Sequence, residues 1–119
     1  MIIKTHQING FKIAELVSDE VLIKTSQDGT DVLGNLYYQD FDRIIIQEKN
    51  IISDFFDLKN GLAGEILQKF SNFRVRLAVV GDFNKYSSRS FNDFMHESNK
   101  GKHVVFVSSV IEGLNILSH

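Results

Sequence analysis

Four acidic side chains follow apolar runs along this chain, and they are the residues best placed to do chemistry. Glu48 comes shortly after an all-isoleucine run, Asp54 and Asp57 lie in the turn beyond it, and Asp82 follows a valine-rich run. If the two runs are neighbouring strands, their carboxyl ends meet at one edge of a sheet, where ligands commonly bind. Carboxylates that converge there can raise a pKa or hold a hard divalent cation.

Two interpretations of these acids stay open. In the first, Glu48 is the acid or base of a small enzyme or ligand-binding protein, with Asp57 and Asp82 as orienting or metal-binding groups. In the second, the acids are solvated in loops, and Asp54 or Asp57 caps a helix. No spacing matches a dedicated metal motif, and the four histidines include no i, i+4 pair, so we expect no metal site and no cofactor.

The adjacent rings of Phe55 and Phe56 also allow two interpretations. In an extended segment neighbouring side chains face opposite sides, so one ring would be exposed and could contact a partner protein. In a turn or a first helical coil, both rings could be buried. The sequence does not choose between the two.

A hydroxyl-rich loop and the start of the helix that follows it carry Lys85 and Arg89. These two cations could bind a phosphate or an acidic partner. The alternative is an ordinary solvated helix start with a serine cap. The composition permits a Ser–His–acid triad, but no nucleophile-elbow pattern accompanies the serines.

Composition limits the functional classes. The chain has 119 residues, 43% hydrophobic and 24% charged, which fits one globular domain spanning 1–119. A formal net charge of −2 favours neither nucleic acid nor an anionic membrane as a partner. There is no cysteine and no apolar stretch long enough to span a membrane, so we expect a cytoplasmic protein.

Strand-like and helix-like segments alternate after an initial hairpin. Asn9-Gly10 between two strand-like runs is a strong signal for a type I′ turn. Gly101 is suited to a left-handed cap at the end of the third helix. Alternation of this kind predicts an α/β domain with a mixed, mostly parallel sheet and packed helices. The expected helices are 27–39, one carrying Leu62 to Phe70, 88–98 and a terminal one, and the expected strands after the hairpin are 43–47, 73–80 and 104–107.

The order of these elements resembles the STAS (anti-sigma-factor antagonist) fold. Segment 55–62 is similar to the aromatic or apolar residue followed by Asp-Ser-Ser-Gly-Leu at the start of the second helix of those proteins. Segments 76–81 and 89–117 are similar to their later strands and helices. The likeness covers roughly residues 8–118. Here Leu58-Lys59-Asn60 separate Asp57 from Gly61, so the serine that a kinase phosphorylates in that family has no counterpart.

The whole chain also resembles a small bacterial family known as domain of unknown function 4180. The similar segments are 48–50, 54–58, 61–65 and 80–83. This resemblance implies a bacterial cytoplasmic protein and brings no assigned activity.

The first hypothesis for function is therefore a non-enzymatic protein-binding or regulatory module with an unidentified protein partner. It would act through the edge formed by 48–62 and 82–89, which contains the acids, the two phenylalanines, Asn60 and Arg89. The alternative is the enzyme or ligand-binding protein built on Glu48. A homodimer is one way in which a small phenylalanine-rich domain can hide apolar surface.

Overall fold

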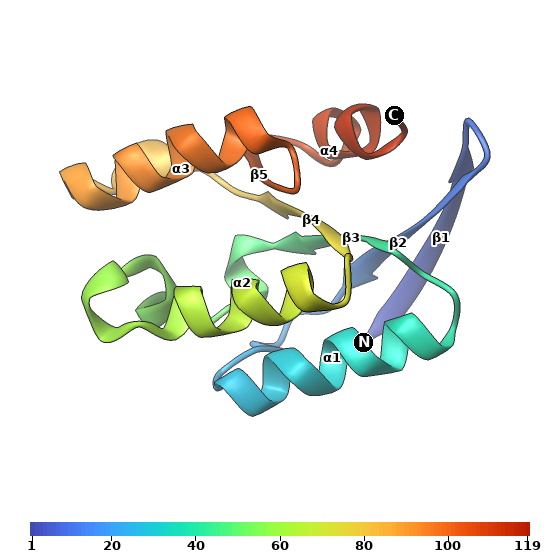
Figure 1. Ribbon diagram of the computed structural model, residues 1–119, viewed down its shortest axis with the longest axis horizontal. Helices are drawn as coiled ribbons and strands as arrows, with labels where there is room; N and C mark the ends of the chain where they lie inside the picture. The colour runs from blue at the N-terminus through green and yellow to red at the C-terminus, as the bar shows by residue number, and fades with distance from the viewer.

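The strands of this protein follow one another across a single sheet in chain order. The computed structural model describes residues 1–119, and its five-stranded sheet has the order β1-β2-β3-β4-β5 (Figure 1). β1 is antiparallel to β2, and every later pair is parallel, so the expected mixed, mostly parallel sheet is confirmed. The strands are β1 (Ile2–Ile8), β2 (Phe11–Val17), β3 (Arg43–Gln47), β4 (Arg76–Val80) and β5 (Val104–Val107).

The hairpin turn has the geometry expected from its sequence. Asn9 and Gly10 have φ values of 53° and 82°, the positive values that a type I′ turn requires at both central residues. Ile8 therefore lies opposite Phe11, and the pairing continues without a bulge to Ile2 opposite Val17.

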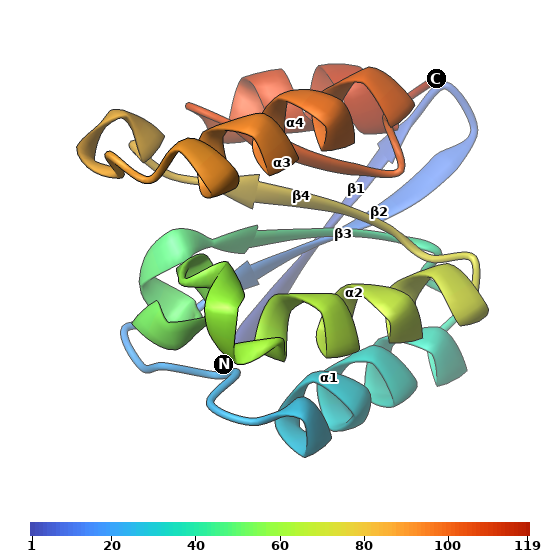
Figure 2. The same cartoon turned by 60° about the vertical axis from the view of Figure 1, so that its left-hand side comes forward.

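Helices cover the sheet unequally. The crossovers between parallel strands are right-handed as a rule, so crossovers that always step the same way across a sheet place their helices on the same face. Three helices accordingly lie on one face, and the last helix, which leads to no further strand, covers the other (Figures 1 and 2). The helices are α1 (Ser26–Tyr38), α2 (Leu62–Asn72), α3 (Arg89–Gly101) and α4 (Val110–Leu117), with 3₁₀ turns η1 (Glu48–Asn50), η2 (Ser53–Phe56), η3 (Leu58–Asn60) and η4 (Phe83–Lys85).

Alternation along the strands divides the core into two parts. Ile44 and Ile46 of β3 point into the larger part, beneath α1, α2 and α3, whereas Ile45 points into the smaller part, beneath α4. The larger cluster contains 21 buried residues and the smaller contains 7. Because both faces are covered, β3 is an uninterrupted apolar run, as is usual for parallel strands.

Several boundaries differ from the sequence prediction. The helices expected at 27–39 and 88–98 span 26–38 and 89–101. The strand expected at 73–80 begins at Arg76, because the amide of Val75 bonds the carbonyl of Phe70 and closes the end of α2. The left-handed cap expected at Gly101 is wrong. α3 includes Gly101, and Lys102 takes the left-handed conformation with φ 59°. None of the four helices has the length and apolar character needed to cross a membrane.

Candidate functional site

Glu48 follows the carboxyl end of β3, and its side chain lies against Gly81, just after the end of β4. Its side chain is only 11% exposed. A Cβ atom placed on Gly81 would lie 2.5 Å from Oε1 and 2.7 Å from Cβ of Glu48, closer than atoms can pack. The missing side chain of Gly81 therefore makes the space that Glu48 occupies.

Two adjacent residues from the loop after β4 bind the Glu48 carboxylate. Both contacts reach Oε2: Tyr86 donates its hydroxyl hydrogen bond to that atom, and Lys85 Nζ lies 2.7 Å from it. Burial, and after it the hydrogen bond to Glu48, raises the pKa of the Tyr86 phenol. The Lys85 side chain is 56% exposed, so this ion pair has one shielded and one solvated member.

An aromatic cluster fixes the direction of the Tyr86 hydroxyl. The Tyr86 ring stacks on Phe56 at 5.2 Å between centroids and meets Phe91 at 5.1 Å. Phe55 packs against Phe56 in turn, at 5.0 Å. Contacts at these separations are the favourable stacked and edge-to-face arrangements of aromatic rings.

Phe55 and Phe56 are therefore both buried, which settles one open question. The interpretation in which one ring is exposed to a partner is wrong. The two residues lie in the 3₁₀ turn η2 rather than in an extended segment, so the two-sided alternation of a strand does not apply. Their role at this edge is to support Tyr86.

A hollow of about 230 Å³ opens beside the Glu48 carboxylate, and we call it the Glu48 pocket. Lys49 and Lys85 contribute cationic groups to its wall, and Phe56 contributes an apolar surface. The complete lining is Glu48, Lys49, Ile51, Ser53, Phe56, Lys85 and Tyr86.

The other predicted acids do not join Glu48. Asp57 and Asp82 are exposed, and each accepts a hydrogen bond from the backbone amide two residues further on, at the start of a 3₁₀ turn. Asp54 is also exposed, and its carbonyl accepts a bond from the Asn60 amide at 2.8 Å. No group of three or more acidic or histidine side chains that could hold a metal ion forms in the protein.

Arg89 lies apart from this site. Its side chain is 95% exposed and its nearest acidic partner is Asp93, 3.9 Å away on the same helix. The hydroxyl of Ser88 accepts the Phe91 amide, so the start of α3 has the serine cap that the sequence predicts.

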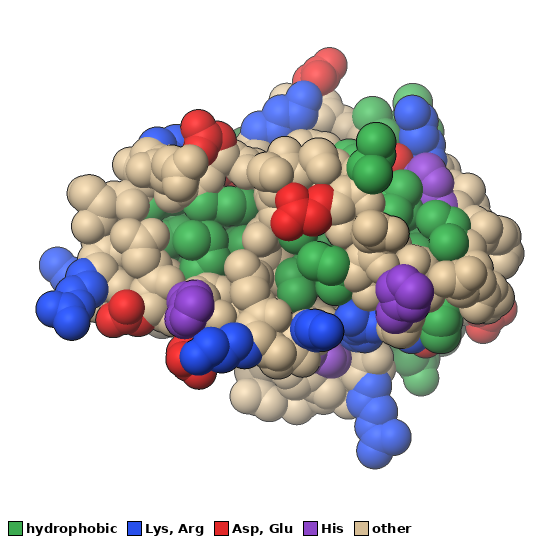
Figure 3. All heavy atoms as spheres, turned by 90° about the horizontal axis from the view of Figure 1, so that it is seen from above, with side chains coloured by type: hydrophobic (Ala, Val, Ile, Leu, Met, Phe, Trp, Pro, Cys, Tyr) green, Lys and Arg blue, Asp and Glu red, His purple; other side chains and the backbone are tan.

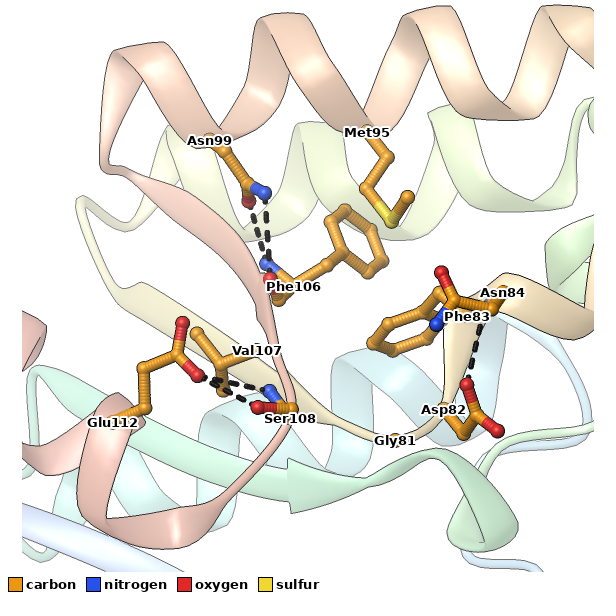
Figure 4. Close-up of a pocket in the computed structure, with 10 residues that line it drawn as sticks. All are labelled: Gly81, Asp82, Phe83, Asn84, Met95, Asn99, Phe106, Val107, Ser108 and Glu112. Carbon is orange, nitrogen blue, oxygen red and sulfur yellow. Dashed lines mark hydrogen bonds between the residues drawn. The ribbon is translucent and has the colours of Figure 1, made fainter.

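A second, larger hollow lies beyond Asp82, where β4 and β5 end. It measures about 380 Å³, and the side chains of Phe83, Met95 and Phe106 line it (Figure 4). Glu112 caps the start of α4 by accepting bonds from Ser108, so this carboxylate is already engaged. The carboxyl end of the sheet thus has a hollow on each side of the loop that follows Gly81, and a third hollow, of about 390 Å³, lies where β2 and β3 end.

Sequence reasoning missed the partners of Glu48. Tyr86 belongs to the hydroxyl-rich loop near Arg89, 38 residues from Glu48 in the sequence, and it bonds Glu48 directly. The signal was Gly81 at the end of a neighbouring strand, since a glycine there marks a close approach by another group.

Comparison with known proteins gives one match. A family model described as "Domain of unknown function (DUF4180)" matches residues 8–117. Neither the curated proteins nor the solved structures contain a match to this chain.

Proposed function

The chain belongs to the DUF4180 family, and we propose that it is a non-enzymatic protein-binding or regulatory module that acts through the carboxyl end of its sheet. The observation that carries this proposal is the pairing of Glu48 with both Tyr86 and Lys85. A carboxylate held by two donors is poorly placed to abstract a proton from a substrate. It is well placed to fix a lysine at the mouth of a pocket.

The chemistry of the pocket mouth suggests the kind of group that it receives. Lys49 and Lys85 are both more than half exposed, and the partly buried Tyr86 ring lines the same pocket. An acidic side chain of a partner could bond either lysine, while an adjacent apolar group packs against the Tyr86 ring. We therefore propose a partner segment that combines an acidic and an apolar residue.

The cellular setting is part of the same proposal. The absence of cysteine in the 119 residues and the mild net charge of −2 support a cytoplasmic protein that does not bind nucleic acid or membranes. The chain-order sheet is compatible with a STAS-like module of bacterial origin, acting without the phosphorylated serine of that family.

A second candidate function uses the same pocket for a small ligand. The shielding of the Glu48 carboxylate favours it, because a carboxylate removed from water in a concave site is a common feature of ligand and active sites. In this case Lys85 and Tyr86 would replace Asp57 and Asp82 as the groups that accompany Glu48.

Partner capture with matched variants tests the first candidate. The test variant carries Lys49→Gln and Lys85→Gln, and the control carries Lys24→Gln and Lys69→Gln, which remove the same charge from exposed positions elsewhere. We expect a partner that binds the wild type and the control but not the test variant, with the affinity then measured by calorimetry on the purified pair. Equal binding to all three proteins would contradict the proposal.

Thermal unfolding tests the second candidate. Divalent cations, nucleotides and small phosphorylated metabolites are added in turn to the wild type and to Glu48→Gln. A ligand at a hundredfold excess over its Kd stabilises the folded state by about 2.7 kcal/mol. A shift of Tm that is present in the wild type and absent in Glu48→Gln would favour the ligand site over the protein-binding module.

A further inference from the structure

The outer edge of β1 is open to pairing with another strand. Because a two-residue turn joins β1 to β2, Ile8 and Phe11 exchange hydrogen bonds, and alternate residues of β1 do the same. The N–H and C=O groups of Ile3, Thr5 and Gln7 therefore point away from β2. No hydrogen bond from elsewhere in the chain reaches them, and no helix lies along this edge (Figure 1).

The opposite edge of the sheet is closed by side chains. Asn99 of α3 accepts the Phe106 amide at 2.7 Å and donates to the Phe106 carbonyl at 3.3 Å (Figure 4). Ser98 donates to the Val104 carbonyl at 2.5 Å. These bonds occupy the outward carbonyls of Val104 and Phe106 and the outward amide of Phe106, which is one way in which proteins prevent unwanted strand pairing.

β1 lacks the features that protect an edge strand from pairing. This strand runs for 7 residues with no bulge and no proline, and Lys4 is its single permanently charged side chain. An edge of this length that carries none of the devices protecting β5 is suited to strand addition.

We propose that β1 pairs with β1 of a second copy of this chain, antiparallel and about a two-fold axis at Thr5. Thr5 then faces Thr5 of the second copy, and Ile3 faces Gln7. These are the residues whose backbone groups point outward, so each facing pair can exchange two hydrogen bonds. The two sheets become one continuous sheet with a closed, isologous interface.

The side chains support a second copy as the occupant. In this register Ile2, which is exposed in the single chain, faces Ile8 of the second copy on the face that carries α4. Lys4 faces His6, whose ring bonds Glu15 at 2.8 Å, so an acid lies close to each lysine. A register centred one facing pair earlier would place Lys4 against Lys4, and like charges directly opposite destabilise a sheet.

The face of the protein seen from above has no single continuous apolar surface. There the apolar side chains form several small patches, with acidic and basic side chains between them (Figure 3). The pairing at β1 also leaves the Glu48 pocket free, so this inference is independent of the proposed function.

Opposite charges introduced at Thr5 test both the pairing and its register. Thr5 is exposed in the single chain, so Thr5→Lys and Thr5→Glu should fold as the wild type does. We expect the wild type to sediment as a dimer of the 13.6 kDa chain at high concentration and to dissociate on dilution. Each variant alone should be a monomer, because Lys would face Lys or Glu would face Glu. An equimolar mixture of the two should restore the dimer.

Controls make each outcome decisive. Ser71→Lys and Ser71→Glu place the same charges on an exposed position of α2, and both should remain dimers when alone. Amide hydrogen exchange should slow at Ile3, Thr5 and Gln7 of the wild type as concentration rises. A wild type that stays monomeric up to its solubility limit, or Thr5 variants that dimerise alone, would overturn the proposal.

Discussion

The two ends of the sheet hold buried charge in opposite ways. At the carboxyl end, the shielded carboxylate of Glu48 is paired with the exposed ammonium of Lys85 and a tyrosine hydroxyl. At the amino end, the buried guanidinium of Arg43 bonds the carbonyls of Leu117 at 2.7 Å and His119 at 3.2 Å, and lies over the Phe11 ring at 3.7 Å.

This difference distinguishes a structural contact from a binding site. We call the contact of Arg43 with the end of α4 the clamp. The hydrogen-bond partners of Arg43 are backbone carbonyls at the end of α4 and just after it, and Asp42 lies 3.7 Å from its Nε atom. Arg76 adds a bond to the His119 carbonyl at 2.7 Å. Burial, and then the charge of Arg43, lowers the pKa of Arg76, so two cations share this end. The carbonyls at the end of α4 compensate these two positive charges. Because the carbonyls belong to the backbone, a ligand cannot replace them. Lys85 is 56% exposed, so it can bond a second anion while it stays paired with Glu48, and the carboxyl end is the one suited to binding.

Removing the clamp should have the largest effect on stability. Arg43→Met deletes two hydrogen bonds from a charged donor, and we expect the free energy of unfolding to fall by about 3 kcal/mol. Arg89→Met, at a solvated position, should change it by less than about 0.5 kcal/mol. Urea unfolding measures both, and amide exchange should show α4 opening first in Arg43→Met. An equal effect of the two substitutions would contradict the clamp.

Filling the space beneath Glu48 should have the next largest effect. Gly81→Ala places a Cβ against Glu48 and should lower the free energy of unfolding by about 2 kcal/mol, because the backbone must shift. Gly34→Ala is the matched control, since its new Cβ meets nothing within 4 Å inside helix α1. There we expect a gain of about 0.5–1 kcal/mol. Unchanged stability in Gly81→Ala would show that Glu48 is free to move.

Tyr86→Phe should reveal the hydrogen bond to Glu48. We expect a loss of about 1 kcal/mol at neutral pH. The pKa of Tyr86 is higher in the folded protein than the ordinary 10.0, so its contribution to stability is complete below pH 10.0 and is lost as pH rises above that value. Stability of the wild type should fall with pH in that range more steeply than that of Tyr86→Phe. Parallel pH profiles would contradict this assignment.

Glu48→Gln should have the smallest effect. The amide oxygen can still accept from Tyr86, and Lys85 is solvated enough to do without its partner, so we expect a change below about 0.5 kcal/mol. Urea unfolding of this variant beside Arg43→Met compares the two ends directly. A loss as large as that of Arg43→Met would mean that Glu48 is a structural charge.

Periodicity was sufficient to predict most of the fold. The Asn9-Gly10 turn, the uninterrupted apolar run of β3 and the alternation of strands and helices each depend on residues close in sequence, and the α/β class is confirmed. Helix ends were less predictable, because at Lys102 a non-glycine residue adopts the left-handed conformation although Gly101 is adjacent.

The site was harder to predict because its contacts are long-range. The position of Glu48 at a strand end follows from its sequence, but its bond to Tyr86 depends on Gly81 and on the stacking of Phe56. The burial of Phe55 and Phe56 depends on η2, a short turn whose sequence has no strong periodic signal.

The chain-order arrangement of the sheet also has a consequence for folding. Each strand pairs with the strand that precedes it, across at most one helix, so no pairing must wait for a distant part of the chain. During synthesis the hairpin can form first and each strand–helix unit can add to it as it leaves the ribosome. Asn99 is made before Phe106, so α3 is present to close the edge of β5 when that strand arrives. The edge at β5, where the sheet grows, is thus covered when the last strand is added. The edge that stays open is that of β1, the first strand to be made.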